Sequence, residues 1–252
     1  MSRPRNYQTE AIVIKKTKLG EAGRILTLYT PQLGKIQAVA KGVRRPRSKM
    51  SGHLELLTHS LVTLVRGRNI DTVIGTQTID GFLPLKSDLR LASYALYVTE
   101  LVNQFTADNL ENYPLFRLTL DTLHHLCQEN DSELVLRYFE LHLLDQVGYR
   151  PQLERCVSCH AGLTGGTNHF SPGAGGVLCP GCGQGQGFTY TFPTDARRLA
   201  LLLQNSDYTS VSVIETDPGL LRQLEMVMRY YLRYLLEREI KSAAWLDTLR
   251  EG

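Results

Sequence analysis

The chain of 252 residues has an ordinary globular composition, 42% hydrophobic and 21% charged, which excludes collagen-like, low-complexity and wholly disordered proteins. Its formal net charge of +3 divides unevenly, because residues 1–85 carry +9 and residues 86–252 carry −6. A strongly basic segment favours an anionic partner such as nucleic acid, although charge can also drift by chance along a chain.

The beginning of the chain shows no targeting signal. Residues 1–7 are polar and basic, and the apolar run over residues 11–14 is too short for a secretory signal. The sequence contains no run of about 18 apolar residues, so no transmembrane helix is predicted. We therefore expect a cytoplasmic protein, and five cysteines in a reducing compartment are typical of metal binding or catalysis rather than of disulfides.

Five β-strands are predicted in the first 80 residues by short runs rich in Ile, Val, Leu and Thr that alternate with turn residues. The runs are residues 11–14, 24–30, 36–40, 54–65 and 70–79. Residues 31–34 predict a hairpin, and a change of apolar register at Leu56 and Leu57 predicts a β-bulge. Five strands in this length are typical of an OB-fold barrel, although an SH3-like barrel or an open sheet fits nearly as well.

Beyond residue 82, apolar side chains recur at helical spacing. Helices are predicted after an N-cap at Ser87, over residues 113–127, from residues 130–132 to a stop at Gly148, and from an N-cap at Thr194 to Gln204. The clearest helix follows Asp217 as N-cap and Pro218 as first residue. The predicted fold class is α+β, with a five-stranded OB-fold β-barrel over residues 1–82 and an α-helical domain over residues 83–252 that a module at 150–190 interrupts.

Two cysteine pairs predict a metal centre. Cys156 and Cys159 form one pair, Cys179 and Cys182 form the other, and the spacing between the pairs is that of a zinc ribbon. One tight turn directs both sulfurs of a pair at one ion, and two pairs complete a tetrahedron with Zn–S distances of about 2.3 Å. A shell of four sulfurs leaves no position for water, so we expect one structural Zn²⁺ that stabilises this Gly-rich segment.

Other chemistries fit the cysteines less well. Cys156 to His160 match the CxxCH pattern of haem attachment, which would need export and would leave Cys179 and Cys182 unexplained. A zinc deaminase signature fails because Leu178 stands where that signature has Pro, and because such a site has three protein ligands. The sequence shows no P-loop, dinucleotide fingerprint, GxSxG or HExxH motif, so we expect a protein without catalytic activity.

The densest positive charge lies in residues 41–49, which we expect to form an exposed loop between two strands. Arg and Lys match phosphate oxygens, and each phosphate contact releases counterions; a merely solvated loop is the alternative. The residues predicted to bind nucleic acid are Arg24, Lys35, Lys41, Arg44, Arg45, Arg47, Lys49, Arg66 and Arg68. Because residues 1–85 hold few aromatic residues, phosphate contacts should dominate over base stacking.

Three segments carry a resemblance to a known family. They are Thr-Glu-Ala-Ile-Val at residues 9–13, Gly-Glu-Ala-Gly-Arg-Ile-Leu-Thr-Leu-Tyr-Thr at 20–30, and Ala-Lys-Gly-Val-Arg-Arg-Pro at 40–46, with Gly34-Lys35 between the last two. Together with two cysteine pairs after a helical segment, they resemble the zinc-containing branch of the bacterial RecO family of recombination-repair proteins. The resemblance covers essentially the whole chain.

This resemblance implies an N-terminal OB-fold, a C-terminal helical domain and an inserted zinc module. It also implies a non-catalytic, ATP-independent mediator that binds single- and double-stranded DNA and anneals complementary strands. Such proteins work with RecR, and often RecF, to load RecA onto DNA coated by single-strand-binding protein, whose C-terminal tail they contact. The matching cations, Arg24 and the loop of residues 41–49, take a DNA-binding role, and we expect the protein to associate with the nucleoid in the cytoplasm.

The residues alone leave two other classes open. An RNA-binding or transcription/translation accessory factor can also combine a basic β-barrel with a structural zinc ribbon, and competition between single-stranded DNA and structured RNA would distinguish it. A zinc hydrolase or deaminase would need an open coordination position at the metal.

Overall fold

The computed structural model describes residues 5–128, 131–163 and 167–251, and the chain divides into two compact units. The first unit consists of residues 1–129 and 241–252, and the second of residues 130–240. The domain boundary predicted between residues 82 and 83 stays a prediction. Among the described residues, no helix is long and apolar enough to cross a membrane.

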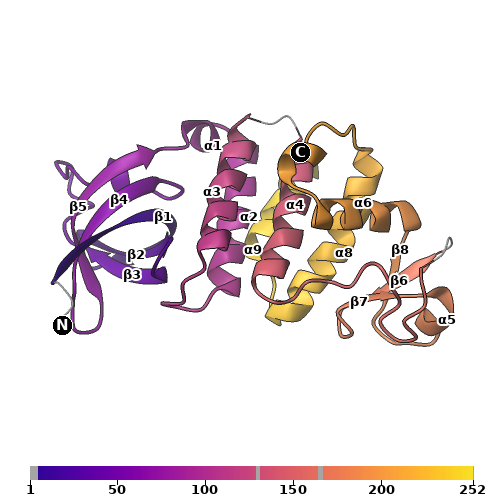
Figure 1. The fold of residues 1–252 in the computed structure, drawn as a ribbon. Helices are drawn as coiled ribbons and strands as arrows, with labels where there is room; N and C mark the ends of the chain where they lie inside the picture. Colours follow the sequence, from indigo (N-terminus) through magenta and orange to yellow (C-terminus); the bar gives the residue numbers. More distant parts are fainter. Residues whose placement is uncertain (1–4, 129–130, 164–166, 252) are drawn as a thin grey trace. The chain divides into compact units, whose positions relative to one another are not determined.

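The first unit begins with a closed five-stranded barrel (Figure 1). Its strands are β1 (Asn6–Leu19), β2 (Gly23–Thr30), β3 (Gly34–Ala40), β4 (His59–Val65) and β5 (Asp71–Asp80). Their order around the barrel is β1-β2-β3-β5-β4, and β3 runs parallel to β5 while the other pairs are antiparallel. This is the OB-fold arrangement, so the prediction of an OB-fold barrel followed by a helical domain is confirmed.

Alternation along the strands fills the barrel. Ala11 and Val13 of β1, Leu26 and Leu28 of β2, and Val62 of β4 are inward-facing and completely buried. Every second residue of a strand points to the same face, so each strand contributes one apolar row to a common core. The turn at residues 31–34 joins β2 to β3 as predicted, with Gly34 at φ +63°, where a Cβ atom would stand 1.9 Å from the carbonyl oxygen of Leu110.

The segment before β4 differs from the prediction. Residues 54–58 are not a strand: Leu54 ends a single 3₁₀ turn, η1 (Gly52–Leu54), and β4 begins only at His59. The bulge predicted at Leu56 and Leu57 is therefore wrong, because Leu57 has a φ of +62°, which ends any extended run before the strand starts. The register shifts elsewhere: between Val13 and Lys15 where β1 pairs with β2, and at His59–Ser60 and Thr63–Leu64 where β4 pairs with β5.

Helices α1 (Leu83–Ser87), α2 (Leu89–Phe105), α3 (Tyr113–Gln128) and α9 (Lys241–Glu251) complete the first unit. Ser87 ends α1, so the N-cap predicted there is wrong; Asp88 caps α2 by accepting a hydrogen bond from the Leu91 backbone N–H at 2.9 Å. A carboxylate accepts this bond at least as well as a hydroxyl and also complements the helix dipole.

The second unit combines helices with a small sheet. Its elements are α4 (Ser132–Gln146), β6 (Asn168–Ser171), β7 (Gly176–Leu178), α5 (Pro180–Gly183), β8 (Tyr190–Phe192), α6 (Thr194–Asn205), α7 (Tyr208–Val211) and α8 (Pro218–Leu236). The three strands form one antiparallel sheet in the order β7-β6-β8.

Most predicted helix ends of the second unit agree with the structure. Asp217 caps α8 before Pro218, and the chain turns at Gly148 with φ +82° after α4. Asp131 caps α4, whereas Asn130, a predicted starting point, lies outside the described residues. Thr194 is the first residue of α6 and not its N-cap, because Pro193 already holds that position.

Candidate nucleic-acid interface and metal centre

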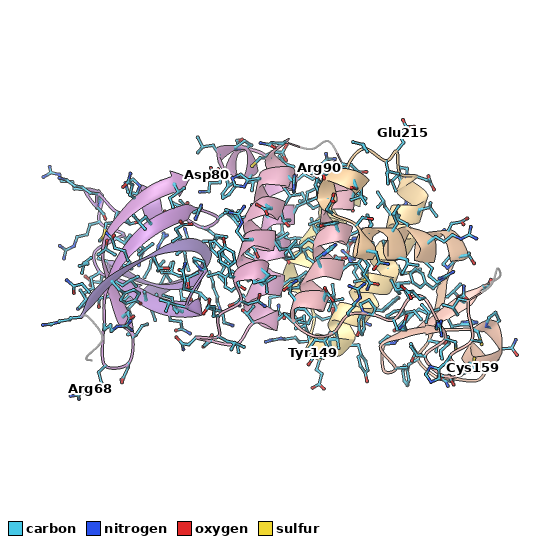
Figure 2. The ribbon with its side chains drawn as sticks, viewed as in Figure 1. Arg68, Asp80, Arg90, Tyr149, Cys159 and Glu215 are labelled. Atoms are coloured by element: carbon cyan, nitrogen blue, oxygen red, sulfur yellow. The ribbon has the colours of Figure 1, made fainter. Side chains whose placement is uncertain are left out.

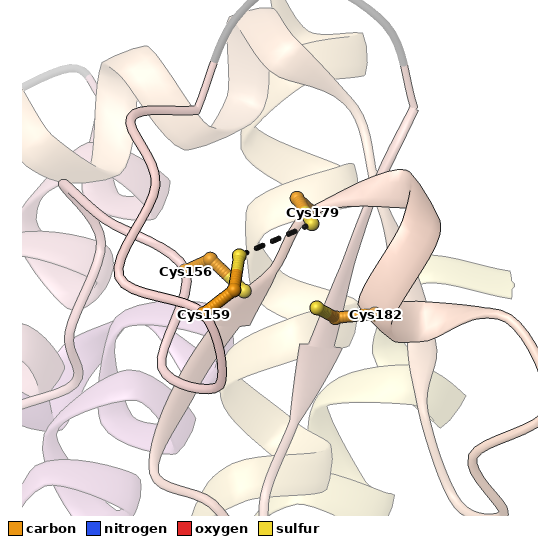
Figure 3. A group of neighbouring side chains, drawn as sticks. All are labelled: Cys156, Cys159, Cys179 and Cys182. Carbon is orange, nitrogen blue, oxygen red and sulfur yellow. Dashed lines mark hydrogen bonds between the residues drawn. The ribbon is translucent and has the colours of Figure 1, made fainter.

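The four paired cysteines meet at one point of the second unit (Figure 3). Cys156 and Cys159 lie on a turn after α4, Cys179 is the N-cap of α5 and Cys182 lies within α5. Both pairs are closed by the same backbone bond: the His160 N–H donates to the Cys156 carbonyl, and the Gly183 N–H donates to the Cys179 carbonyl, each at 2.9 Å. The two CxxC segments therefore form equivalent knuckles.

The sulfur positions suit a single tetrahedral ion. All four Sγ atoms lie within 4.8 Å of one another, and those of Cys159 and Cys179 are 3.8 Å apart. Four sulfurs at about 2.3 Å from a central ion stand about 3.8 Å from each other, whereas a disulfide requires about 2.05 Å. All five cysteines are free thiols, so the predicted group of four could hold a metal ion.

The backbone around Cys156 favours a thiolate. Burial raises the pKa of this thiol, but hydrogen bonds from the backbone N–H groups of Cys159, Cys179 and Ser158 outweigh that effect and lower the pKa to about 6. The neighbouring thiol of Cys179 raises the pKa of Cys182 instead, since the close thiols share their protons. Because metals bind thiolates, the donor set and its hydrogen bonds fit a metal centre.

The five cations of residues 41–49 lie together in the connection between β3 and β4. Lys41, Arg44, Arg45, Arg47 and Lys49 are all exposed, and their segment forms turns, as predicted. The loop contains no acidic residue, so no negative charge within residues 41–49 offsets the five positive charges.

The basic loop is fixed to the turn between β1 and β2. The backbone N–H of Arg44 donates to the carbonyl of Ala22 at 3.0 Å, and its guanidinium donates to the carbonyl of Gly20 at 3.3 Å. Val43 between these cations is buried in the barrel core. OB-folds bind nucleic acid on the β2–β3 face and on the β1–β2 and β4–β5 connections, so the loop lies beside a common binding region of this fold.

Arg24 is held by a carboxylate next to the loop. Glu55 accepts from the Arg24 guanidinium at 3.3 Å and pairs with the Lys16 ammonium. Burial raises the pKa of Glu55, but the hydrogen bond and charge of Lys16, with the charges of Arg24 and Lys86, hold it below its ordinary value. Glu55 therefore stays ionised and offsets part of the positive charge of this surface.

The remaining predicted cations have different surroundings. Arg68 is exposed at the tip of the β4–β5 hairpin (Figure 2), whereas the guanidinium of Arg66 lies 4.5 Å from the centre of the Tyr7 ring. The Lys35 ammonium donates to two backbone carbonyls at 2.7 Å and pairs with Asp108 at 3.3 Å. A DNA contact at Lys35 stays a prediction. The Lys35 ammonium already binds two carbonyls and a carboxylate within the protein.

The sequence prediction omits some exposed cations of the same unit. Lys15 and Lys18 are exposed on the end of β1, and Lys18 stands directly across from Arg24 in the β1–β2 ladder. Arg5 is exposed next to Arg66, whose backbone N–H donates to the Arg5 carbonyl at 2.9 Å. The sequence signal for Lys15 and Lys18 is the Lys-Lys-Thr-Lys run at residues 15–18, which lies outside the predicted strand of residues 11–14.

The class of the protein follows from the barrel: it is an OB-fold protein with a basic loop and a four-cysteine centre. Family models of the N-terminal and C-terminal domains of recombination protein O match residues 1–82 and 86–244. The DNA repair protein RecO of Dehalococcoides mccartyi strain 195 is 43% identical over 249 residues, covering 99% of this chain and 98% of the relative.

Two further relatives have the same name. The DNA repair protein RecO of Roseiflexus sp. strain RS-1 is 40% identical, covering 99% of this chain and 88% of its own length. That of Symbiobacterium thermophilum is 33% identical and covers 98% of both chains. The chain belongs to the RecO family of DNA repair proteins, which confirms the resemblance drawn from its sequence.

Proposed function

We propose that this protein is a non-catalytic recombination mediator that binds single- and double-stranded DNA and anneals complementary strands. With RecR and RecF, it helps to load RecA onto single-stranded DNA coated by single-strand-binding protein, and it contacts the C-terminal tail of that protein. The observation that carries the proposal is the loop of residues 41–49, whose five cations are exposed and free of acidic neighbours within the loop. Family membership supports the role in DNA repair.

The loop acts through phosphate contacts. Within residues 5–82, Tyr29 and Phe82 are buried and Tyr7 is covered by Arg66, so the barrel offers no open row of aromatic rings for stacking. Contacts to phosphate oxygens carry no sequence information, so binding depends on salt far more than on sequence. Two strands neutralised on one cationic surface repel each other less, which favours their annealing.

The metal in this proposal is one structural Zn²⁺ held by Cys156, Cys159, Cys179 and Cys182. The matching knuckles, the sulfur spacing and the N–H groups directed at Cys156 support it. A four-thiolate shell supplies folding stability and leaves no position for a reacting water. We place the protein in the cytoplasm, associated with the nucleoid.

Reversing three loop charges tests the proposal. The variant with Arg44→Glu, Arg45→Glu and Arg47→Glu should lose DNA binding, and each lost duplex phosphate contact should reduce the slope of log affinity against log salt by about 0.9. Fluorescence anisotropy over a range of salt concentrations measures both. Reversing three exposed arginines of the second unit, Arg198, Arg222 and Arg238, is the matched control and should leave the affinity nearly unchanged.

Unchanged affinity of the loop variant at low salt would rule out this surface. A strand-annealing assay on naked DNA and on DNA coated by single-strand-binding protein tests the mediator role, and the loop variant should fail on both. Competition between single-stranded DNA and structured RNA distinguishes the proposal from an RNA-binding accessory factor, which would prefer the RNA.

A further inference from the structure

A cavity of about 570 Å³ lies in the first unit outside the basic loop. It is lined by the β2–β3 turn and strand β3 at residues 32–37, by the β4–β5 connection and the start of β5 at residues 66–71, by the α2–α3 connection at residues 108–111, and by Tyr7 of β1. This volume falls in the range of about 300–1,000 Å³ that is typical of small-ligand sites. It is large enough for one nucleoside unit.

Hydrogen bonds hold the walls of the cavity in place. The Asp71 carboxylate accepts from the Gly67 backbone N–H at 3.0 Å and from the Tyr7 hydroxyl, which fixes the β4–β5 connection. The Asn109 backbone N–H donates to the Lys35 carbonyl at 2.8 Å, which fixes the α2–α3 connection on the edge of β3. A site formed before the ligand arrives binds it without an ordering cost.

Four of the polar residues that line the cavity are carboxamides. They are Gln32, Gln37, Asn69 and Asn109, all exposed. None of these four side chains has a hydrogen-bond partner among the residues that the structure describes. A carboxamide carries a donor and an acceptor side by side, which is the pattern that matches the edge of a nucleobase. Leu33, Ile36 and Ile70 add apolar surface that suits the face of a planar ring.

The charge of the cavity excludes a phosphate as its ligand. Asp71, Asp108 and Glu111 carry three negative charges there, against two positive charges on Lys35 and Arg66. Both cations are engaged, Lys35 with Asp108 and Arg66 over the Tyr7 ring. An anion would therefore be repelled, whereas a neutral ligand with several N–H and C=O groups would be bound.

The edge of β3 also disfavours an added peptide strand. A bridge between Lys35 and Asp108 already occupies this edge, and the Lys35 carbonyl already accepts from Asn109. A peptide that adds to a sheet needs these backbone groups free.

We propose that this cavity receives one unstacked base of a bound single strand, with Gln37 and Asn69 pairing with its hydrogen-bonding edge. The proposal rests on the DNA-binding function proposed above and adds a base-specific contact to it. The exposed Arg68 precedes Asn69 in the sequence and the exposed Arg5 lies two residues before Tyr7, and in this proposal both bind the phosphates of that strand. The Watson–Crick edge of a base is already paired in a duplex, so only an unpaired base can offer this edge to the cavity.

Comparison of two strands of equal length and charge tests this proposal. One is a mixed-sequence strand, and the other is the same strand with its bases replaced by abasic sites. The protein should bind the strand with bases about tenfold more tightly, since one well-placed bidentate contact discriminates by about this factor. The double variant Gln37→Ala, Asn69→Ala should lose this preference and keep the salt dependence of binding.

The matched control removes the same two residue types elsewhere on the barrel, as Asn6→Ala and Gln77→Ala, which are exposed and do not line the cavity. It should retain the preference. Equal binding of both strands by the unmodified protein overturns the base site but leaves the proposed phosphate contacts untouched. DNA binding by the unmodified protein that does not depend on salt counts against the proposed function itself. A preference that survives the double variant also overturns the proposal, because the base contacts would then lie elsewhere.

Discussion

At the scale of single residues, Glu55 controls how much positive charge the barrel presents. It pairs with both Lys16 and Arg24 beside the basic loop. Replacing Glu55 by Gln removes the negative charge and releases both cations, so DNA affinity should rise about threefold at low salt and the salt slope should steepen by up to about one. Anisotropy titrations at several salt concentrations measure this.

The control for this change is Glu215→Gln, which removes a negative charge from an exposed position of the second unit. It should raise the affinity less, because Glu215 lies outside the unit that carries the basic surface. If Glu55→Gln binds no more tightly than its control, Arg24 and Lys16 do not contact DNA.

His59 predicts a pH dependence of stability. Burial lowers its pKa from the ordinary value of 6.5, and the nearby Glu10 carboxylate opposes this only in part. Below pH 6.5 the unfolded chain therefore takes up a proton that the folded barrel resists, and the free energy of unfolding should fall as the pH falls, by at most about 1.4 kcal/mol per pH unit from this residue. Urea denaturation at several pH values between 7.5 and 5.5 measures this free energy, which should change less steeply with pH in the His59→Gln variant than in the unmodified protein.

An identical pH dependence of the free energy of unfolding in the variant would contradict the role of His59. Some pH dependence should remain in the variant, because burial also lowers the pKa of His142 in the second unit. His142 therefore adds to the same loss of stability in the same direction.

At the scale of elements, Glu100 of α2 caps a helix that is distant in sequence. Its carboxylate accepts from the backbone N–H of Lys241 at 3.1 Å and of Ser242 at 2.8 Å, and from the Ser242 hydroxyl. The first N–H groups of a helix have no partner within the helix, and a carboxylate there also complements the dipole. This contact joins α9 to α2.

Glu100→Ala should destabilise the first unit by about 1–2 kcal/mol, because the N–H groups at the start of α9 lose their acceptor. Glu100→Gln keeps one acceptor oxygen and should lose less. Urea denaturation measures the change, and faster proteolysis within residues 241–251 would locate it. An alanine variant as stable as the unmodified protein would show that α9 is held by its apolar contacts alone.

Local sequence signals predicted the elements that depend on local chemistry. Asp217-Pro218 marked the start of α8, and the turn at residues 31–34 marked a hairpin, because caps and turns are set by neighbouring residues. The meeting of the four cysteines was predictable because two CxxC pairs at this spacing are typical of metal sites, in which both spacing and residue type are constrained. The prediction failed where tertiary contacts override local preference, as at Leu57, whose positive φ no apolar pattern reveals.

The candidate DNA surface was predictable only in part for the same reason. The density of Arg and Lys in residues 41–49 is a local property and was visible. The pairing of Arg24 with Glu55 and the enclosure of Lys35 join residues 31 or more positions apart and arise only from the barrel fold. The cavity beside β3 is likewise formed by segments that are separate in the sequence, so no local sequence motif predicts it.

At the scale of the whole molecule, the basic loop and the metal centre belong to different units. Removing the metal with a chelator should therefore lower the melting temperature, through loss of the β6–β8 region, while the DNA affinity of the barrel changes by less than about twofold, as expected for independent sites. Elemental analysis should find one zinc per chain before chelation and none after it. Calorimetry and anisotropy on the same samples measure the two effects.

Two cysteine variants provide the matched comparison. Cys159→Ser should lose the metal, whereas Cys127→Ser, which changes a half-buried thiol of α3 outside the group of four, should keep it. A folded protein with four titratable thiols and no metal would refute the centre. A large loss of DNA affinity on chelation would show that the two units are coupled.

The first unit is formed by two segments of the chain that the second unit separates, and this order has a consequence for biosynthesis. Its barrel and helices α1 to α3 leave the ribosome first, at roughly 5–20 residues per second, but α9 follows only after the entire second unit has been made. Until then, α2 has α1 and α3 beside it but lacks α9, and the Glu100 carboxylate has no Ser242 to bind. A chain that stalls within residues 130–240 therefore exposes an apolar helix surface, by which chaperones and proteases can distinguish an unfinished copy from a complete one.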